Sequence, residues 1–131
     1  MMQLTQDILR DVVQTVNGSL VVDVSEDSDK KVLIDFSAPF PRINITQELE
    51  RSLKCKLPDL NSKDSLPLLL DVCSKNDIKV EKPFTLPRIV DKMVSHLIEP
   101  NCIQPTFLYG HPICMSPLAK SINPVTSIMC F

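Results

Sequence analysis

The distribution of proline is the feature that most restricts how this 131-residue chain can fold. No proline precedes Pro39, and all eleven prolines lie from that position onward. Proline fixes φ and biases the residue before it away from the helical region, so Pro39 and Pro41 predict an extended segment around Phe40. Beyond this segment, a helix must either hold proline in its first turn or end before one.

The proline-free start predicts a helix followed by a β-hairpin. The apolar residues of 3–17 recur at the spacing of one helix side, and Gly18 is typical of the position just after a helix. That apolar row consists of Leu4, Ile8, Leu9, Val12, Val13 and Val16. Two β-rich runs then flank a polar turn, which predicts strands within Ser19–Val24 and Lys30–Phe36.

A short helix is predicted directly after the extended segment. It covers about 45–54, with Asn44 or Thr46 as its cap. Leu49 and Leu53 are four residues apart and therefore lie on the same side of this helix, which we expect to face the core.

Two further helices are predicted in the middle of the chain, each with a proline in its first turn. They cover Ser65–Lys75 and Leu86–Glu99, and residues 76–84 form the linker between them, with a possible short strand. Thr85 is the predicted cap of the second helix, and Pro100 stops it. Its apolar side consists of Ile89, Val90, Met93, Val94 and Leu97.

The last third of the chain is almost uncharged. Lys120 is the one charged side chain from Pro100 to the end. We expect Pro105–Tyr109 and Pro112–Leu118 to be strands buried on both faces. An antiparallel sheet that carries a helical insertion is the natural assembly of these elements, so the predicted fold class is α+β.

Composition excludes some classes of function. The net charge of −2 and the pI of about 5.6 do not indicate the broad basic face that binds nucleic acid. Gly18 and Gly110 are the only glycines, so neither a Walker-type phosphate loop nor a dinucleotide GxGxxG can be formed. No charged-then-apolar stretch opens the given sequence, so we expect no signal peptide, and no apolar run approaches the ~20 residues that span a bilayer. We therefore expect a cytoplasmic location.

The residues that often form catalytic or zinc sites have more ordinary interpretations here. The five cysteines are odd in number and form no CxxC pair, which favours buried free thiols over a zinc site. His111, with Ser116, Cys114 and aspartates elsewhere in the chain, could be imagined as a hydrolase triad, but the usual GxSxG turn is missing. His96 lies beside the apolar side of its predicted helix and is interpreted as a packing or rim residue.

Two clusters of charge are interpreted as solvated surface. The acidic cluster lies in the predicted hairpin turn and lacks the glycine and terminal glutamate of a calcium loop. The basic cluster is sparse and has no aromatic partners, so it more simply keeps the surface soluble. The two clusters are Asp23, Glu26, Asp27 and Asp29, and Lys54, Lys56 and Lys63.

Several short stretches within residues 3–120 occur in a recognisable order and spacing. They are Ile34-Asp35-Phe36-Ser37-Ala38-Pro39-Phe40-Pro41-Arg42-Ile43-Asn44, Gln47-Glu48-Leu49-Glu50, Lys56-Leu57-Pro58, Asp91-Lys92-Met93-Val94, Gln104-Pro105-Thr106-Phe107, His111-Pro112 and Met115-Ser116-Pro117-Leu118-Ala119-Lys120. Together they resemble the catalytic domain of class II lysyl-tRNA synthetases. The stretches from Gln104 to Lys120 are similar to the strand pair that precedes the third class II motif.

This resemblance implies a partial class II catalytic domain over residues 1–131, built on an antiparallel sheet. Within it, 44–99 would be a helical insertion, 100–120 a buried strand pair and 121–131 a divergent tail. Synthetases of this family use ATP and magnesium to activate lysine, transfer the lysine to tRNA, and work as homodimers. The chain would then be a segment of a lysine–tRNA ligase.

The departures from the family pattern decide which roles can be transferred. The first two class II motifs would precede Met1, and no acidic residue follows Glu99 where the third motif would bind magnesium and ATP. We therefore assign no catalytic, cofactor-binding or metal-binding residue and no cofactor to this chain. We expect it to be inactive alone and to self-associate through its apolar last third.

Two other interpretations remain open. The chain could be a non-catalytic interaction module that reuses the synthetase scaffold. It could also come from a related class II ligase for aspartate or asparagine, although the stretches around Phe40 and Met115 favour lysine.

Overall fold

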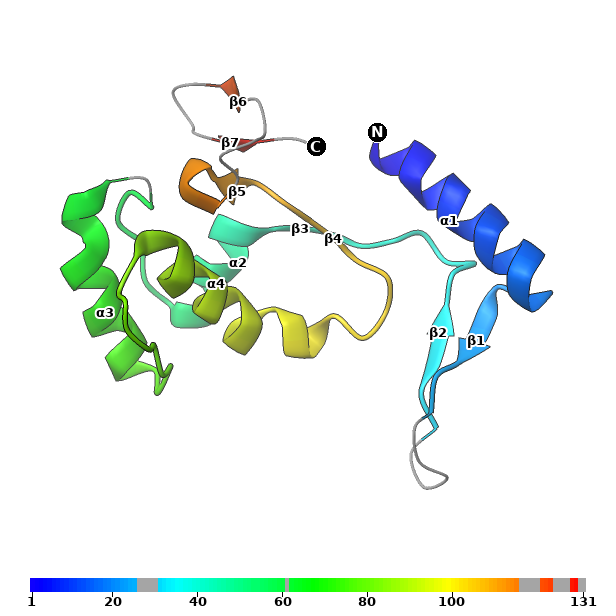
Figure 1. Ribbon diagram of the computed structural model, residues 1–131, viewed down its shortest axis with the longest axis horizontal. Helices are drawn as coiled ribbons and strands as arrows, with labels where there is room; N and C mark the ends of the chain where they lie inside the picture. The colour runs from blue at the N-terminus through cyan, green and yellow to red at the C-terminus, as the bar shows by residue number, and fades with distance from the viewer. Residues whose placement is uncertain (26–30, 61, 116–120, 124–127, 130–131) are drawn as a thin grey trace. The chain divides into compact units, whose positions relative to one another are not determined.

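The protein is described by a computed structural model whose chain divides into two compact units (Figure 1). The described residues are 1–25, 31–60, 62–115, 121–123 and 128–129, the last two ranges by their backbone alone. Unit 1 consists of Met1–Arg42 and Cys102–Phe107, and unit 2 of Ile43–Asn101 and Leu108–Phe131. The chain combines helices with small sheets, which confirms the α+β class.

Unit 1 begins with helix α1 (Met2–Asn17) and the hairpin of β1 (Val21–Asp23) and β2 (Leu33–Asp35). The helix ends where predicted, because Gly18 takes the left-handed conformation at φ 68° and donates its N–H to the Gln14 carbonyl at 2.9 Å. The two strands pair antiparallel. The predicted helix and hairpin are confirmed, with strands shorter than the β-rich runs.

The buried centre of unit 1 is aromatic. Phe40, in the proline-flanked segment, is 6% exposed, and its ring centroid lies 6.0 Å from that of Phe36 and 5.7 Å from that of Phe107. Gln6 of α1 is also buried, and its Oε1 accepts a hydrogen bond from the Phe40 N–H at 2.8 Å. The polar side of α1 therefore faces this centre.

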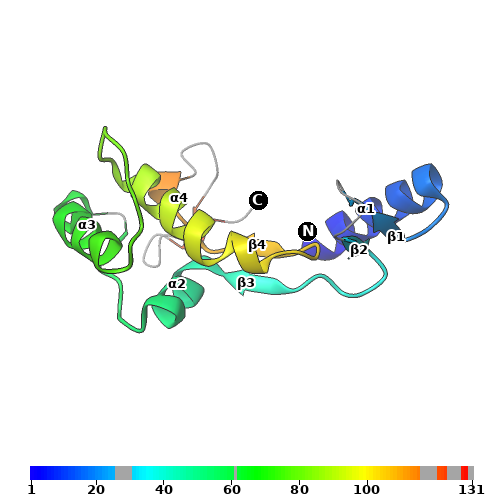
Figure 2. The same cartoon turned by 90° about the horizontal axis from the view of Figure 1, so that it is seen from below.

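Unit 2 is built on three helices, α2 (Ile45–Leu53), α3 (Leu66–Lys75) and α4 (Leu86–Leu97). Helix α4 contacts both α2 and α3 (Figure 2). The side chains that these contacts exclude almost completely from solvent include Ile45, Leu49, Leu69, Ile89, Val90, Met93 and Ile98. The predicted inner side of α4 is confirmed at Ile89, Val90, Met93 and Val94, while Leu97 is half-buried.

The two predicted helix caps differ. Asn44 caps α2, because its Oδ1 accepts the N–H of Gln47 at 3.1 Å. Thr85 stands at the cap position of α4 but makes no side-chain capping hydrogen bond. The prediction that α4 reaches Glu99 is wrong: the helix ends at Leu97 and a 3-10 turn covers Glu99–Asn101. The proline at position 100 has no N–H to donate to the carbonyl four residues earlier, so the α-helical hydrogen-bond pattern cannot continue to it.

The remaining strands are short. β3 (Arg42–Asn44) and β4 (Phe107–Tyr109) form a two-stranded sheet. β5 (His111–Pro112) and β6 (Ser121–Asn123) both pair antiparallel with β7 (Ile128–Met129). In the described backbone, β4 therefore pairs with β3, and β5 pairs with β7.

The predicted strand Pro112–Leu118 is wrong over residues 113–115. Ile113–Met115 is a 3-10 helix, while residues 116–118 lie outside the described part of the chain. β4 is half-buried throughout, not buried on both faces. The strand prediction failed at these residues because a short apolar run has no periodicity that separates a strand from another buried conformation.

Candidate functional site

The four arginines are the first candidates for a phosphate or carboxylate site, since their guanidinium groups bind such anions in pairs of hydrogen bonds. The guanidinium group of Arg10 already binds backbone carbonyls of the protein. Its Nε donates to the Phe36 carbonyl at 2.7 Å, and its Nη2 donates to the carbonyls of Ser37 and Ala38 at 2.7 and 2.9 Å. The guanidinium carbon also lies 5.8 Å from the centre of the Phe40 ring. Arg10 therefore holds the extended segment.

The other three arginines lie on separate elements of the fold. Arg88 on α4 donates to the Lys82 carbonyl at 3.1 Å. Arg51 on α2 forms an exposed ion pair with Glu48 at 3.7 Å. Arg42 is exposed on β3. Within the described part of each unit, no two of these arginines are found on a common partner. Two of the four donate hydrogen bonds to backbone carbonyls.

Within unit 1, stretches that carry the family resemblance are joined by hydrogen bonds. The side chain of Gln104 adds to β2, because its Oε1 accepts the Asp35 N–H and its Nε2 donates to the Leu33 carbonyl, both at 2.9 Å. The Asp35 carboxylate accepts the Ser37 hydroxyl at 2.6 Å and the Ser37 N–H at 2.8 Å. These bonds stabilise the ionised form and lower the pKa of Asp35. These side chains therefore support the backbone of unit 1.

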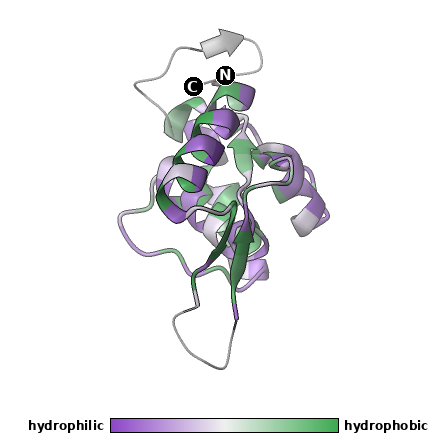
Figure 3. Cartoon of the chain, turned by 90° about the vertical axis from the view of Figure 1, so that its right-hand side faces the viewer, coloured by the Kyte–Doolittle hydropathy of each residue, from purple (hydrophilic) through white to green (hydrophobic). Residues whose placement is uncertain are grey.

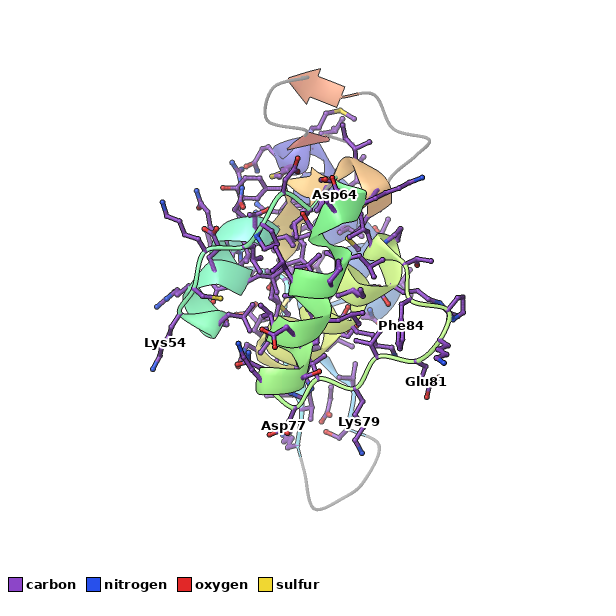
Figure 4. The ribbon with its side chains drawn as sticks, turned by 90° about the vertical axis from the view of Figure 1, so that its left-hand side faces the viewer. Lys54, Asp64, Asp77, Lys79, Glu81 and Phe84 are labelled. Atoms are coloured by element: carbon purple, nitrogen blue, oxygen red, sulfur yellow. The ribbon has the colours of Figure 1, made fainter. Side chains whose placement is uncertain are left out.

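Two hollows in unit 2 lie between the linker after α3 and the side of α4. One has a volume of about 240 Å³ and is lined by Val80, Glu81, Arg88, Asp91 and Lys92. The other, of about 310 Å³, is lined by Asp77, Ile78, Lys79, Lys92, Ser95 and His96. Figure 4 shows Lys79, Glu81 and Phe84 on this linker. Both signs of charge line each hollow, so neither has the character of an anion site.

The residues of the imagined hydrolase triad have local roles where they are described. The Cys114 thiol donates to the Leu60 carbonyl at 3.3 Å, and burial raises its pKa. Burial lowers the pKa of His111, which disfavours the charged imidazole. Ser116 lies outside the described residues, so the triad interpretation stays untested there.

The structure also tests the predictions made for the cysteines, for His96 and for the two clusters of charge. Cys73 is buried, and burial raises its pKa, whereas Cys55 is exposed, so the predicted burial of the free thiols is confirmed at Cys73 and is wrong at Cys55. His96 is exposed and borders the larger hollow, so it is a rim residue. The Ser25 hydroxyl and N–H donate to Asp23 at the end of β1, which lowers the pKa of Asp23, while Glu26, Asp27 and Asp29 of the acidic cluster lie outside the described residues. The three lysines of the basic cluster, Lys54, Lys56 and Lys63, are exposed.

Neither a metal site nor a membrane span is found in the part of the chain that is described. No three His, Cys, Asp or Glu side chains there lie close enough to hold an ion together. Each of the described helices is too short or too polar to cross a bilayer.

The chain matches no family model, but it is similar to known proteins over most of its length. It is 40% identical over 127 residues to the probable cytoplasmic lysine–tRNA ligase of Vairimorpha ceranae, and 38% identical over 127 residues to that of Encephalitozoon cuniculi. Each match covers 92% of this chain. A lysine–tRNA ligase of the bacterium Mycoplasmopsis fermentans is 36% identical over 125 residues, or 95% of the chain.

The matches span only part of each relative. They cover 25% of the Vairimorpha and Encephalitozoon proteins and 24% of the Mycoplasmopsis protein. The chain thus corresponds to about a quarter of the length of these ligases.

Proposed function

We propose that this chain is a segment of the catalytic domain of a class II lysine–tRNA ligase, lying between the second and third class II motifs. The observation that carries the proposal is the similarity to proteins named lysine–tRNA ligases, at 36–40% identity over more than nine-tenths of the chain. The order of the family-like stretches in the sequence supports the same assignment.

The role proposed for the segment is structural support of the catalytic centre. The contacts of Arg10, Asp35 and Gln104 support this role, because each satisfies backbone groups of the protein. ATP, magnesium, lysine and tRNA would be bound by other parts of the intact ligase, which in this family is a homodimer.

The isolated chain is therefore expected to have no ligase activity. Removing one preorganised charge-stabilising group commonly costs about 2.7–4 kcal/mol of transition-state stabilisation. Since no arginine, acidic or metal group of the reaction is assigned to this chain, the loss should extend to all measurable activation. We also propose that the isolated chain self-associates through residues 100–131.

Two assays test the assignment. In the first, the isolated chain should give no lysine-dependent ATP–pyrophosphate exchange above a heat-denatured control. In the second, the chain replaces the matching quarter of the Vairimorpha ceranae protein. This chimaera should charge tRNA with lysine, and with neither aspartate nor asparagine. Exchange by the isolated chain, or a folded but inactive chimaera, would contradict the proposal.

A non-catalytic interaction module is the second candidate, and one observation favours it: unit 1 exposes an apolar helix side that could bind another protein. Activity of the chimaera separates the two candidates. A module that has diverged from ligase function should not restore the relative's activity.

A further inference from the structure

Helix α1 exposes its apolar side to solvent. Its row of aliphatic residues is 59% exposed at Leu4, 52% at Ile8, 52% at Val12 and 75% at Val16. Figure 3 shows apolar residues returning on successive turns of this helix. Amphipathic helices normally bury such a row, so α1 has the opposite orientation to the usual one.

The orientation of α1 is fixed by polar contacts on its other side. Residues two apart on a helix point in directions about 200° apart, so Gln6 and Arg10 lie opposite Leu4 and Ile8. Gln6 accepts the Phe40 N–H, and Arg10 binds three consecutive carbonyls. Rotating the helix to bury its apolar row would break all four hydrogen bonds and leave the buried Phe40 N–H unpaired. The exposed row is therefore a stable property of unit 1.

The hairpin of the same unit also exposes aliphatic side chains. Val21, Val24 and Leu33 are 45%, 48% and 42% exposed. Exposed apolar groups in such number on one small unit are typical of a surface that another part of a protein covers.

We propose that the row Leu4, Ile8, Val12 and Val16, called here the α1 row, is a packing surface for the rest of the ligase polypeptide, outside the quarter that this chain matches. The inference rests on the proposed function. The relatives have about three further quarters of chain available to cover it. The α1 row itself carries no charge, so the covering surface is apolar.

Side-chain oxidation by hydroxyl radicals tests this directly, because the reaction rate follows the solvent exposure of each side chain. The isolated chain is compared with the chimaera that carries it within the Vairimorpha ceranae ligase. Leu4, Ile8 and Val12 should be oxidised several-fold more slowly in the chimaera. Cys55 and other residues of unit 2 provide the internal reference for exposure outside unit 1.

A matched pair of variants adds a second measurement. Val12→Asp places a charge in the α1 row, whereas Gln14→Asp places the same charge on the same helix outside it. Val12→Asp should abolish tRNA charging by the chimaera or make it insoluble, and Gln14→Asp should leave activity near that of the parent. In the isolated chain both variants should unfold at the parent's urea midpoint, since position 12 faces water there.

The outcomes separate this inference from the proposed function. An active chimaera whose α1 row is oxidised as fast as in the isolated chain overturns the inference and leaves the function intact. A folded, inactive chimaera contradicts the function, while its oxidation rates still decide the inference. If the chimaera is insoluble, the isolated chain decides. A Val12→Asp variant that unfolds at a lower urea concentration than the parent shows that the chain itself already covers the α1 row. A variant that converts a stable dimer into monomer shows that a second copy covers it.

Discussion

Units 1 and 2 use apolar residues in opposite ways. Among the described residues, all but one of the buried apolar side chains belong to unit 2, and Phe40 is the exception. Among these described residues, the exposed large apolar side chains lie mostly in unit 1. They are Met1, Leu4, Ile8, Leu9, Val12, Val16, Val21, Val24, Leu33 and Ile103 there, against Leu68, Phe84 and Ile113 in unit 2.

The difference shows two ways of holding a small unit together. Unit 2 packs α4 against α2 and α3 and gains stability from the removal of aliphatic side chains from water. Unit 1 is held by three aromatic rings and by the hydrogen bonds that Gln6, Arg10 and Gln104 form with backbone groups. A unit of the second kind can keep its fold while leaving an apolar surface for another part of a protein.

The largest effect should come from the core of unit 2. Met93 on α4 is fully buried, and Met93→Ala should reduce the free energy of unfolding by about 2–5 kcal/mol, from lost burial and the cavity left behind. Ile8→Ala in the α1 row of unit 1 should change it by less than about 0.5 kcal/mol. Urea unfolding followed by circular dichroism measures both. Equal losses for the two variants would contradict the contrast between the units.

Removal of the Gln6 side chain should destabilise unit 1 selectively. Gln6→Ala leaves the buried N–H of Phe40 without its acceptor, a cost of about 1–3 kcal/mol. Amide hydrogen exchange should therefore speed up in α1 and around Phe40, with little change in α4. The control is Gln3→Ala on the same helix, which removes an exposed contact with Asp7. If Gln3→Ala accelerates exchange as much, the Gln6 contact has no special role.

The two cap positions of unit 2 should differ in energy. Asn44→Ala removes a capping hydrogen bond and should cost about 0.5–2 kcal/mol. Thr85→Ala removes a side chain that makes no such bond, so the loss should stay within a few tenths of a kcal/mol. Thermal or urea unfolding of the two variants gives the comparison, and a loss at Thr85 equal to that at Asn44 would refute it.

The smallest effect concerns pH and lies in unit 1. The folded-state pKa of Asp35 is lowered from 3.8, first by the Ser37 hydroxyl and then by the Ser37 N–H. A lowered folded pKa contributes stability that is present above 3.8 and is lost as the pH falls through the folded value. NMR titration of the Asp35 carboxyl should show a pKa nearer 3.8 in Ser37→Ala than in the parent. An unchanged pKa would mean that the hydroxyl has little influence.

The sequence predicted most of the helices because their signals are local. The Asn17-Gly18 end of α1, the Asn44 cap and the prolines in the first turns of α3 and α4 each act on neighbouring residues, and all appear at the predicted places. The strand predicted over Pro112–Leu118 failed at Ile113–Met115, because a short apolar run fits several backbone conformations. The sequence also missed the positioning roles of Gln6, Arg10 and Gln104. Its one available signal was the spacing of four between Gln6 and Arg10 on the polar side of a helix.

Helix α1 separates what the sequence predicts, the helix itself, from what it does not predict, the side of the helix that is buried. Its period and its glycine by themselves predicted an amphipathic helix over residues 3–17, and α1 covers 2–17, since helix spacing and the left-handed end are properties of adjacent residues. Which side of that helix is buried was decided only by the tertiary structure. Gln6 and Arg10 find their partners at residues 36–40, far along the chain, and these contacts outweigh the burial of an aliphatic row that has nothing in unit 1 to cover it.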